Sequence, residues 1–180
     1  ANYNDFDWRV SIAELTSDAA FSAYPGVDRI VTLLSPDAIS LSVDGVETWI
    51  TKFRPFTFPG EVTVSARLSG RRATDLNVMS RRGSIRASVR MHTSERLLWA
   101  TVPEGETSVC IVLAGRASLR WQKDPQVDLG ERDAVIVTGP GRFVISGRPD
   151  LALHQVHTGD QRPGVVFVHV RFHRLGGEGR

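Results

Sequence analysis

The chain has 180 residues, with 22 Lys+Arg against 20 Asp+Glu and a formal net charge of +2. This length fits one large domain or two small ones. Because 41% of the residues are hydrophobic, the composition supports a folded core and excludes global disorder. No apolar run reaches the roughly 18 residues of a membrane span, so we expect no membrane partner.

The N-terminal residues show neither the basic nor the apolar segment of a signal peptide. The single cysteine, Cys110, excludes an internal disulfide and a multi-cysteine metal site. Its neighbours Val109 and Ile111 predict a buried structural thiol in a strand. Together these features favour a reducing, cytoplasmic compartment.

Arginine dominates the basic residues, since Lys52 and Lys123 are the only lysines. Six arginines gather between positions 71 and 90, but no aromatic residue separates them and no helix-turn-helix pattern is present. We therefore expect a solvated basic segment and no nucleic-acid partner.

Short strand-like runs follow one another along the whole chain. In chain order, the predicted strands are 8–12, 28–34, 38–43, 47–51, 61–68, 75–79, 96–101, 108–113, 117–121, 134–137, 143–146, 151–157 and 165–172. Turn residues separate them, with Asp44-Gly45 as a hairpin signal and no clean helical period in any window. The pattern predicts an all-β sandwich or barrel.

The order of strands and turns repeats with an offset of roughly 80 residues, which suggests two fused β-units. We expect a first unit at 1–88, a second at 89–175 and a flexible tail at 176–180, with the join near Gly83 to Thr93. The second unit is the more degenerate of the two.

Four phrases in the first half occur together and in order: Asp7-Trp8-Arg9-Val10-Ser11-Ile12-Ala13, Phe21-Ser22 with Tyr24-Pro25-Gly26-Val27-Asp28-Arg29, Pro55-Phe56-Thr57-Phe58-Pro59-Gly60-Glu61, and Asp75-Leu76-Asn77-Val78-Met79-Ser80-Arg81-Arg82-Gly83. In these phrases the sequence resembles the HutD/Ves family of bacterial cupin-like proteins. The resemblance implies a jelly-roll (double-stranded β-helix) sandwich of two cupin-like units. It also implies a sensor or governor role in histidine utilisation, with urocanate or formylglutamate as the ligand. One family phrase, Trp-x-Asn-Gly-Gly-Gly-x-Thr, is absent before Asp5. Either the protein has lost this phrase or the sequence begins after it. If that phrase lines the pocket, the site of this sequence is altered or incomplete.

Arg29 is the first candidate for a ligand-binding residue. It lies in a strongly apolar predicted strand, where an unpaired charge is costly to bury. A planar guanidinium pairs with a carboxylate through two hydrogen bonds, which suits a small acidic ligand. The alternative is an arginine at the strand end that reaches solvent or pairs with Asp28. The family resemblance favours ligand contact.

Further candidates surround it in the same phrases. Phe56 and Phe58 share one face of a short strand and either wall a pocket for a flat ligand or fill the core. Glu61 either contacts an imidazole or amide N–H or is a turn residue. Asn77 shares a strand face with Asp75 and Met79, which either lines the cavity or faces outward.

Tyr24 either forms a pocket lip beside Arg29 or belongs to a plain tight turn. Arg81 and Arg82 are expected to be exposed. The alternation around Trp8 assigns Trp8 and Val10 to the core, with Arg9 and Ser11 on the other face.

The five histidines do not form a cupin metal set, because no His-x-His occurs and the first half has no histidine. His154 and His157 are three residues apart, on opposite strand faces. His169 and His173 share a face with Arg171, whose charge disfavours a divalent ion. We therefore expect no metal and no other cofactor, and we find no hydrolase, phosphate-loop or dinucleotide motif.

Three functions remain open. The first is a non-enzymatic protein that binds a small carboxylate, with Arg29 as the anion anchor. The second is a metal-independent cupin enzyme with Glu61 as general base and Arg29 as its electrostatic partner. The third is a regulatory protein that binds a protein partner, and a homodimer is expected from the fold alone.

Overall fold

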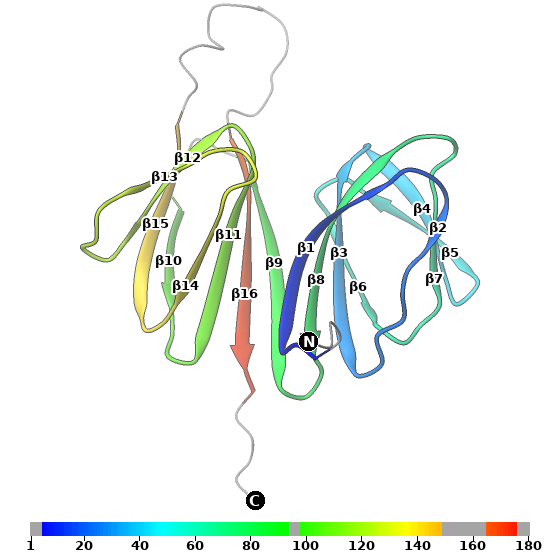
Figure 1. The fold of residues 1–180 in the computed structure, drawn as a ribbon, viewed down its shortest axis with the longest axis horizontal. Coiled ribbons are helices and arrows are strands. Elements are labelled where there is room, and N and C mark those ends of the chain that lie inside the picture. Colours follow the sequence, from blue (N-terminus) through cyan, green and yellow to red (C-terminus); the bar gives the residue numbers. More distant parts are fainter. Residues whose placement is uncertain (1–4, 94–97, 149–164, 176–180) are drawn as a thin grey trace, which may run out of the picture. The chain divides into compact units, whose positions relative to one another are not determined.

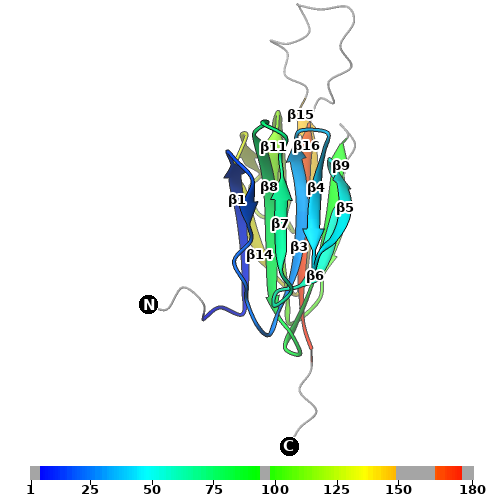
Figure 2. The same ribbon diagram turned by 90° about the vertical axis from the view of Figure 1, so that its right-hand side faces the viewer.

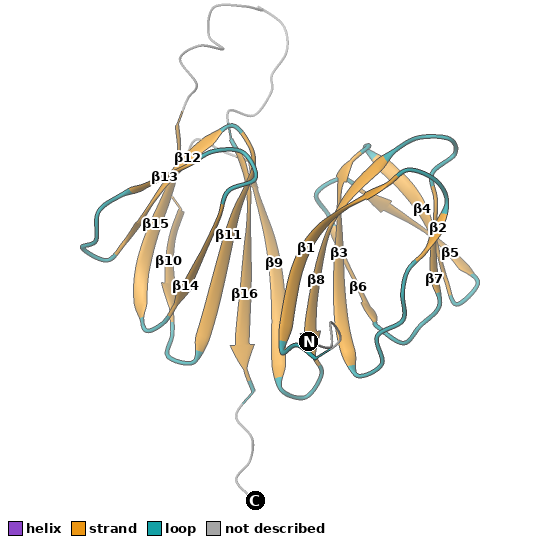
Figure 3. Cartoon of the chain, viewed as in Figure 1, coloured by secondary structure: helices purple, strands orange, loops and turns teal. Residues whose placement is uncertain are grey.

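The computed structural model describes residues 5–93, 98–148 and 165–175. These residues form strands and loops without any helix, as Figure 3 shows. Over the same residues, no helix is long and apolar enough to cross a membrane. The chain divides into two compact units, one of residues up to Val89 together with those from Arg174 onward, and one of Arg90–His173.

The first unit contains two four-stranded antiparallel sheets (Figure 1). One sheet has the order β1-β8-β3-β6, and the other has the order β2-β7-β4-β5. Their strands are β1 (Trp8–Leu15), β2 (Ala19–Ala20), β3 (Val27–Ser35), β4 (Ala38–Val43), β5 (Val46–Thr51), β6 (Pro55–Pro59), β7 (Val64–Arg67) and β8 (Ala73–Arg81).

The second unit has the same plan. One sheet has the order β14-β11-β16-β9 and the other β10-β15-β12-β13. The strands are β9 (Ile85–Thr93), β10 (Leu98–Val102), β11 (Glu106–Ala114), β12 (Arg116–Trp121), β13 (Val127–Leu129), β14 (Ala134–Thr138), β15 (Gly141–Arg148) and β16 (Val166–Arg174). Strand by strand, this order repeats that of the first unit.

A pair of glycine turns shows how closely the units correspond. The N–H of Gly60 donates to the carbonyl of Val27, and the N–H of Gly139 donates to the carbonyl of Glu106. At either glycine, a Cβ would collide with backbone carbonyls, among them that of Tyr24 beside Gly60. Both positions therefore require glycine, because the turn passes directly over the start of the neighbouring strand.

The strand register gives the same correspondence. The β3–β8 ladder shifts between Leu33 and Ser35, and the β11–β16 ladder shifts between Val112 and Ala114. A β-bulge of this kind fixes which side chains turn inward beyond it. Aligning the two bulges places Ser108 of the second unit at the position of Arg29 in the first.

Each unit has its own apolar core, and alternation along the strands builds both. In the first unit the core consists of Val31, Leu33, Ile39, Leu41, Ile50, Phe58, Val64, Ala66, Leu68 and Ala73. In the second it consists of Val102, Cys110, Val112, Ala117, Leu119, Leu129, Val137, Phe143, Ile145, Val165 and Phe167. Cys110 is buried and unpaired, as expected, and burial raises the pKa of its thiol to about 12.

The division between the units falls between Val89 and Arg90, inside the stretch Gly83 to Thr93 that was expected to contain the join. Most of this stretch is strand, because β9 occupies it. Short strands β2 and β13 had too few residues to show a period. The predicted strand 151–157, with His154 and His157, and the predicted tail 176–180 lie outside the described residues.

Replacing Leu41 by Ala tests the core of the first unit. Leu41 is fully buried, so we expect Leu41→Ala to lower the free energy of unfolding by about 2–5 kcal/mol. Val46 is 67% exposed, so Val46→Ala should change the free energy of unfolding by no more than about 0.5 kcal/mol. Urea unfolding of both variants measures the difference, and equal losses would contradict the assignment of this core.

Candidate functional site

The candidate site lies on the inner face of the sheet β1-β8-β3-β6 of the first unit. Figure 2 views this unit from the side of its other sheet, β2-β7-β4-β5. Side chains from these strands meet in rows because the strands are in register. One row contains Arg9, Met79, Arg29 and Phe58, and the next contains Ser11, Asn77, Val31 and Phe56. Phe58 and Val31 belong to the core of the unit, so both rows face the interior.

Arg29 is the central residue of the first row and is only 3% exposed. Its Nη1 donates to the carbonyl oxygen of Ser22 at 2.9 Å, and its Nη2 donates to Oδ1 of Asn77 at 2.8 Å. Its buried Nε has no hydrogen-bond partner among the described residues. Among the residues that the structure describes, the guanidinium therefore donates to two neutral oxygens and to no carboxylate.

Three aromatic rings surround this guanidinium. Its central carbon lies 5.1 Å from the ring centres of Phe21 and Phe58, and 5.6 Å from that of Tyr24. Phe56 packs against Phe58 with the ring centres 5.9 Å apart. Cation–π attraction at such distances offsets part of the cost of removing the charge from water. Burial nevertheless lowers the pKa of Arg29 from its usual value.

Asn77 links Arg29 to a buried acid. Its amide nitrogen donates to Oδ1 of Asp75 at 2.9 Å. Oδ2 of Asp75 is buried and has no hydrogen-bond partner in the described part of the chain. Asp75 is 1% exposed, and burial raises the pKa of its carboxyl despite the opposing effects of Asn77 and Arg29. Asp75 is therefore a weak counter-charge, held one amide away from the guanidinium.

Arg9 belongs to the same inner face, contrary to the expected core position of Trp8 and Val10. Leu15 packs against the core, and alternation along β1 places Arg9 on the same side as Leu15. Ile12, which alternates with this set, is 37% exposed. Alternation therefore separated the two faces of β1 correctly. The face with Trp8 and Val10, however, points away from the interior of the first unit, and the face with Arg9 points toward it.

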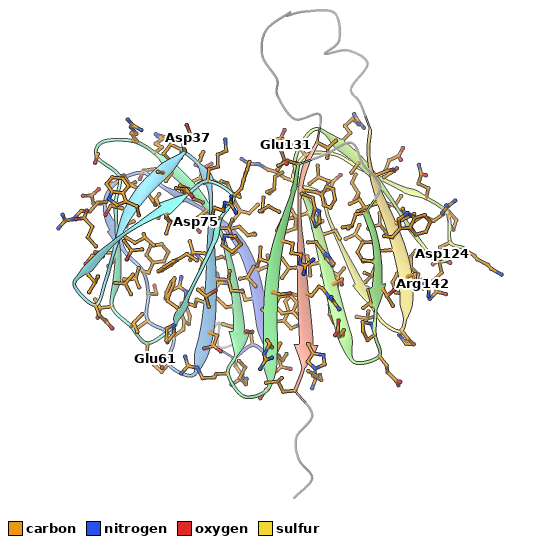
Figure 4. The ribbon with its side chains drawn as sticks, turned by 180° about the vertical axis from the view of Figure 1, so that it is seen from behind. Asp37, Glu61, Asp75, Asp124, Glu131 and Arg142 are labelled. Atoms are coloured by element: carbon orange, nitrogen blue, oxygen red, sulfur yellow. The ribbon has the colours of Figure 1, made fainter. Side chains whose placement is uncertain are left out.

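Glu61 lies outside this cluster. Its carboxylate is exposed and accepts two hydrogen bonds from Arg82, at 2.6 and 3.0 Å. Arg82 also donates from Nε to Asp28 at 2.7 Å. The bond from Arg82 lowers the pKa of Glu61. Figure 4 shows Asp75 among the strands of the first unit and Glu61 at one end of it.

Most of the predicted residues meet in one place. Arg29, Phe58, Asn77 and Met79 are buried, while Tyr24 and Phe56 are partly buried. Three further residues of this cluster had no predicted role in ligand binding: Phe21, Ser22 and Arg9. Phe21 and Ser22 stand in the sequence phrase that contains Tyr24 and Arg29. Their closeness to Arg29 in the sequence is the signal that could have pointed to them.

The second unit carries different chemistry at the corresponding positions. Oγ of Ser108 lies 3.1 Å from Nε2 of His169, and both residues are buried. The carboxylate of Glu106 binds Arg171 at 2.7 Å and His173 at 3.0 Å. The expected shared face of His169, Arg171 and His173 is therefore real. Here, however, the arginine is neutralised by a carboxylate of its own chain.

Burial, together with the neighbouring His92 and Arg171, lowers the pKa of His169 to about 4. This imidazole is neutral at physiological pH. Among residues 5–93, 98–148 and 165–175, no group of three or more His, Cys, Asp or Glu side chains is arranged to hold a metal ion.

Known proteins match this chain along most of its length. Residues 1–153 match the HutD family. The chain belongs to the HutD family. Protein Ves of Cronobacter sakazakii is 45% identical over 132 residues, which cover 72% of this chain and 68% of that protein. Protein Ves of Citrobacter koseri is 42% identical over 89 residues, 48% of this chain, and the match spans about half (47%) of that relative.

Solved structures agree on the fold. HutD from Pseudomonas fluorescens SBW25 (formate condition) superposes with a TM-score of 0.71 at 20% identity, covering 98% of this chain and 84% of that one. A cupin 2 conserved barrel domain protein from Leptotrichia buccalis gives 0.54 at 7% identity, covering 94% of this chain and 84% of that one. The expected all-β cupin-like architecture is confirmed.

The unpaired acid in the site gives a pH prediction. The carboxyl of Asp75 has a higher pKa in the folded chain than in the unfolded chain, so the unfolded state releases its proton first as pH rises. We expect this residue to make stability fall as the pH rises above the unfolded pKa, until the folded pKa is passed. Asp75→Asn should remove this contribution to the fall in stability. The side-chain oxygen of the new residue can still accept the hydrogen bond from Asn77.

Urea unfolding between pH 4 and 7 measures both proteins. Asp37→Asn is the matched control, because Asp37 is exposed. A slope that is unchanged in Asp75→Asn would contradict the raised pKa.

Proposed function

We propose that this HutD-family chain binds a small carboxylate in the interior of its first unit and senses or sequesters it without turnover. Arg29 is the anion anchor in this proposal. Histidine utilisation is the pathway implied by the family resemblance, with urocanate or formylglutamate as the ligand. The reducing cytoplasm is the proposed compartment, in keeping with the unpaired Cys110.

The observation that carries the proposal is the uncompensated charge of Arg29. A buried cation normally has a carboxylate in direct contact, because an unpaired charge is costly away from water. Arg29 instead donates to Ser22 and Asn77, keeps Nε unpaired and meets its nearest acid only through Asn77. A ligand carboxylate would supply the missing charge and accept from the free N–H.

The surroundings of Arg29 suit a small, partly flat ligand. The rings of Phe21, Tyr24 and Phe58 offer apolar surfaces beside the guanidinium. Small-molecule sites commonly combine aromatic walls with a few polar groups that fix the orientation. Asn77 and Met79 complete the floor of this site on β8.

The enzymatic alternative with Glu61 as general base receives no support from its surroundings. A general base at neutral pH benefits from a raised pKa. The exposed Glu61 has a lowered pKa instead, because Arg82 binds its carboxylate. This contrast favours binding over turnover.

Calorimetric titration with urocanate, formylglutamate, histidine and formate tests the proposal. We expect at least one of these to bind more tightly than millimolar, and Arg29→Ala to abolish that binding. Arg67→Ala is the matched control, because Arg67 is exposed at the end of β7. Arg29→Lys should fold with its charge retained but bind more weakly, because a lysine cannot offer two parallel hydrogen bonds.

The ligand is then recovered from the protein and analysed by NMR. Unchanged ligand supports a sensor, whereas conversion to product would favour the enzyme. If none of the four compounds binds, or if Arg29→Ala binds equally well, the proposal fails.

A further inference from the structure

We infer that the ligand of the first unit carries two acidic groups, and that Arg9 holds the second one. This inference rests on the proposed function and specifies its ligand class: a dicarboxylate or a similar small dianion. Arg9 then acts as a specificity-determining residue, which separates dianions from monoanions of the same size.

The strand register places Arg9 and Arg29 in one row. Arg9 pairs with Met79 across β1 and β8, and Met79 pairs with Arg29 across β8 and β3. Neighbouring strands lie about 4.8 Å apart, so two spacings put the backbones of the two arginines about 10 Å from each other. The long side chains can close part of this gap from either side.

Their charges are close enough to affect each other, because Arg9 lowers the pKa of Arg29. Two cations on one inner face repel, and the repulsion disfavours the site when it is empty.

Arg9 is partly buried and makes no hydrogen bond or ion pair with the described residues. The arginines around it behave differently: Arg81 binds Asp5 and Asp7, and Arg82 binds Asp28 and Glu61. Each of those exposed arginines has acids within reach. Arg9, on the inner face, forms no ion pair with the described residues.

The balance of charge on this inner face is positive. Besides Arg81, which is paired with Asp5 and Asp7, it contains the guanidinium groups of Arg9 and Arg29 and the acid Asp75, whose ionisation is disfavoured by burial. A monocarboxylate on Arg29 would leave Arg9 uncompensated. A ligand with two acidic groups a few carbons apart would neutralise both cations and remove their repulsion.

The row also explains why the two ends of such a ligand meet different surroundings. The Arg29 end lies among aromatic rings, whereas the Arg9 end lies on β1, next to the partly buried Ser11. We assign the first carboxylate to Arg29 and the second to Arg9, with the side chain of Met79 beneath the carbon chain of the ligand.

A pair of isosteric probes isolates the second charge. Glutarate has two carboxylates, and glutaramate replaces one of them by an amide of the same shape. We expect wild-type protein to bind glutarate about tenfold or more tightly than glutaramate in calorimetric titrations. Arg9→Gln should abolish this preference, so that the variant binds glutarate and glutaramate with similar affinity.

Arg9→Lys should restore part of the preference, because it restores the charge. Arg86→Gln, an exposed change of the same kind on β9, is the matched control and should leave both affinities unchanged. Thermal unfolding verifies that each variant is folded.

The outcomes separate the two claims. If wild-type protein binds the two probes equally well, or if Arg9→Gln weakens both by the same factor, this inference fails and the proposed function stands. If neither probe nor any other carboxylate binds to wild-type protein, both the proposed function and this inference fail.

Discussion

The buried guanidinium of Arg29 is the constraint around which the first unit is organised. A positive charge with 3% exposure is costly unless every neighbour favours it. Three different segments supply those neighbours: the carbonyl of Ser22 before β3, the amide of Asn77 on β8 and the ring of Phe58 on β6. A residue that needs partners from so many segments fixes their relative positions. Even so, the partners supplied by the fold are neutral, and Nε is left over.

The second unit shows what the same framework does when its charge is balanced internally. Aligning the two bulges puts Ser108 where Arg29 stands, His169 where Asn77 stands and Arg171 where Met79 stands. Where the first unit has Arg29 and Asn77, the second unit therefore has two neutral groups, Ser108 and His169. Its Arg171 is bound to Glu106. One oxygen of Glu106 accepts from Arg171, and the other lies 3.0 Å from Nδ1 of His173. Among the described residues, Arg171 of the second unit is thus paired with a carboxylate, whereas Arg29 of the first unit is not.

Much of this fold could be read from the sequence, because alternation and turn chemistry are local properties. Strands such as β3 and β11 and the Asp44-Gly45 hairpin needed no tertiary information. β9 did not stand out, because its exposed positions carry Arg86, Ser88 and Arg90, which read as a loop.

The candidate site could likewise be predicted only where the local sequence was informative. Arg29 could be selected because a charge in an apolar strand is conspicuous. Arg9 could not, because alternation divides a strand into two faces without saying which one a neighbouring sheet will cover.

The position of Asp75 connects these observations. A carboxylate in direct contact with Arg29 would neutralise it, as Glu106 neutralises Arg171, and would leave no reason for an anion to enter. Asn77 prevents that contact by accepting from Arg29 with its oxygen and donating to Asp75 with its nitrogen. The amide thereby keeps the acid near enough to orient the network and too far away to complete an ion pair. A direct ion pair between the two charges would remove the uncompensated charge of Arg29 on which the proposed anion binding depends.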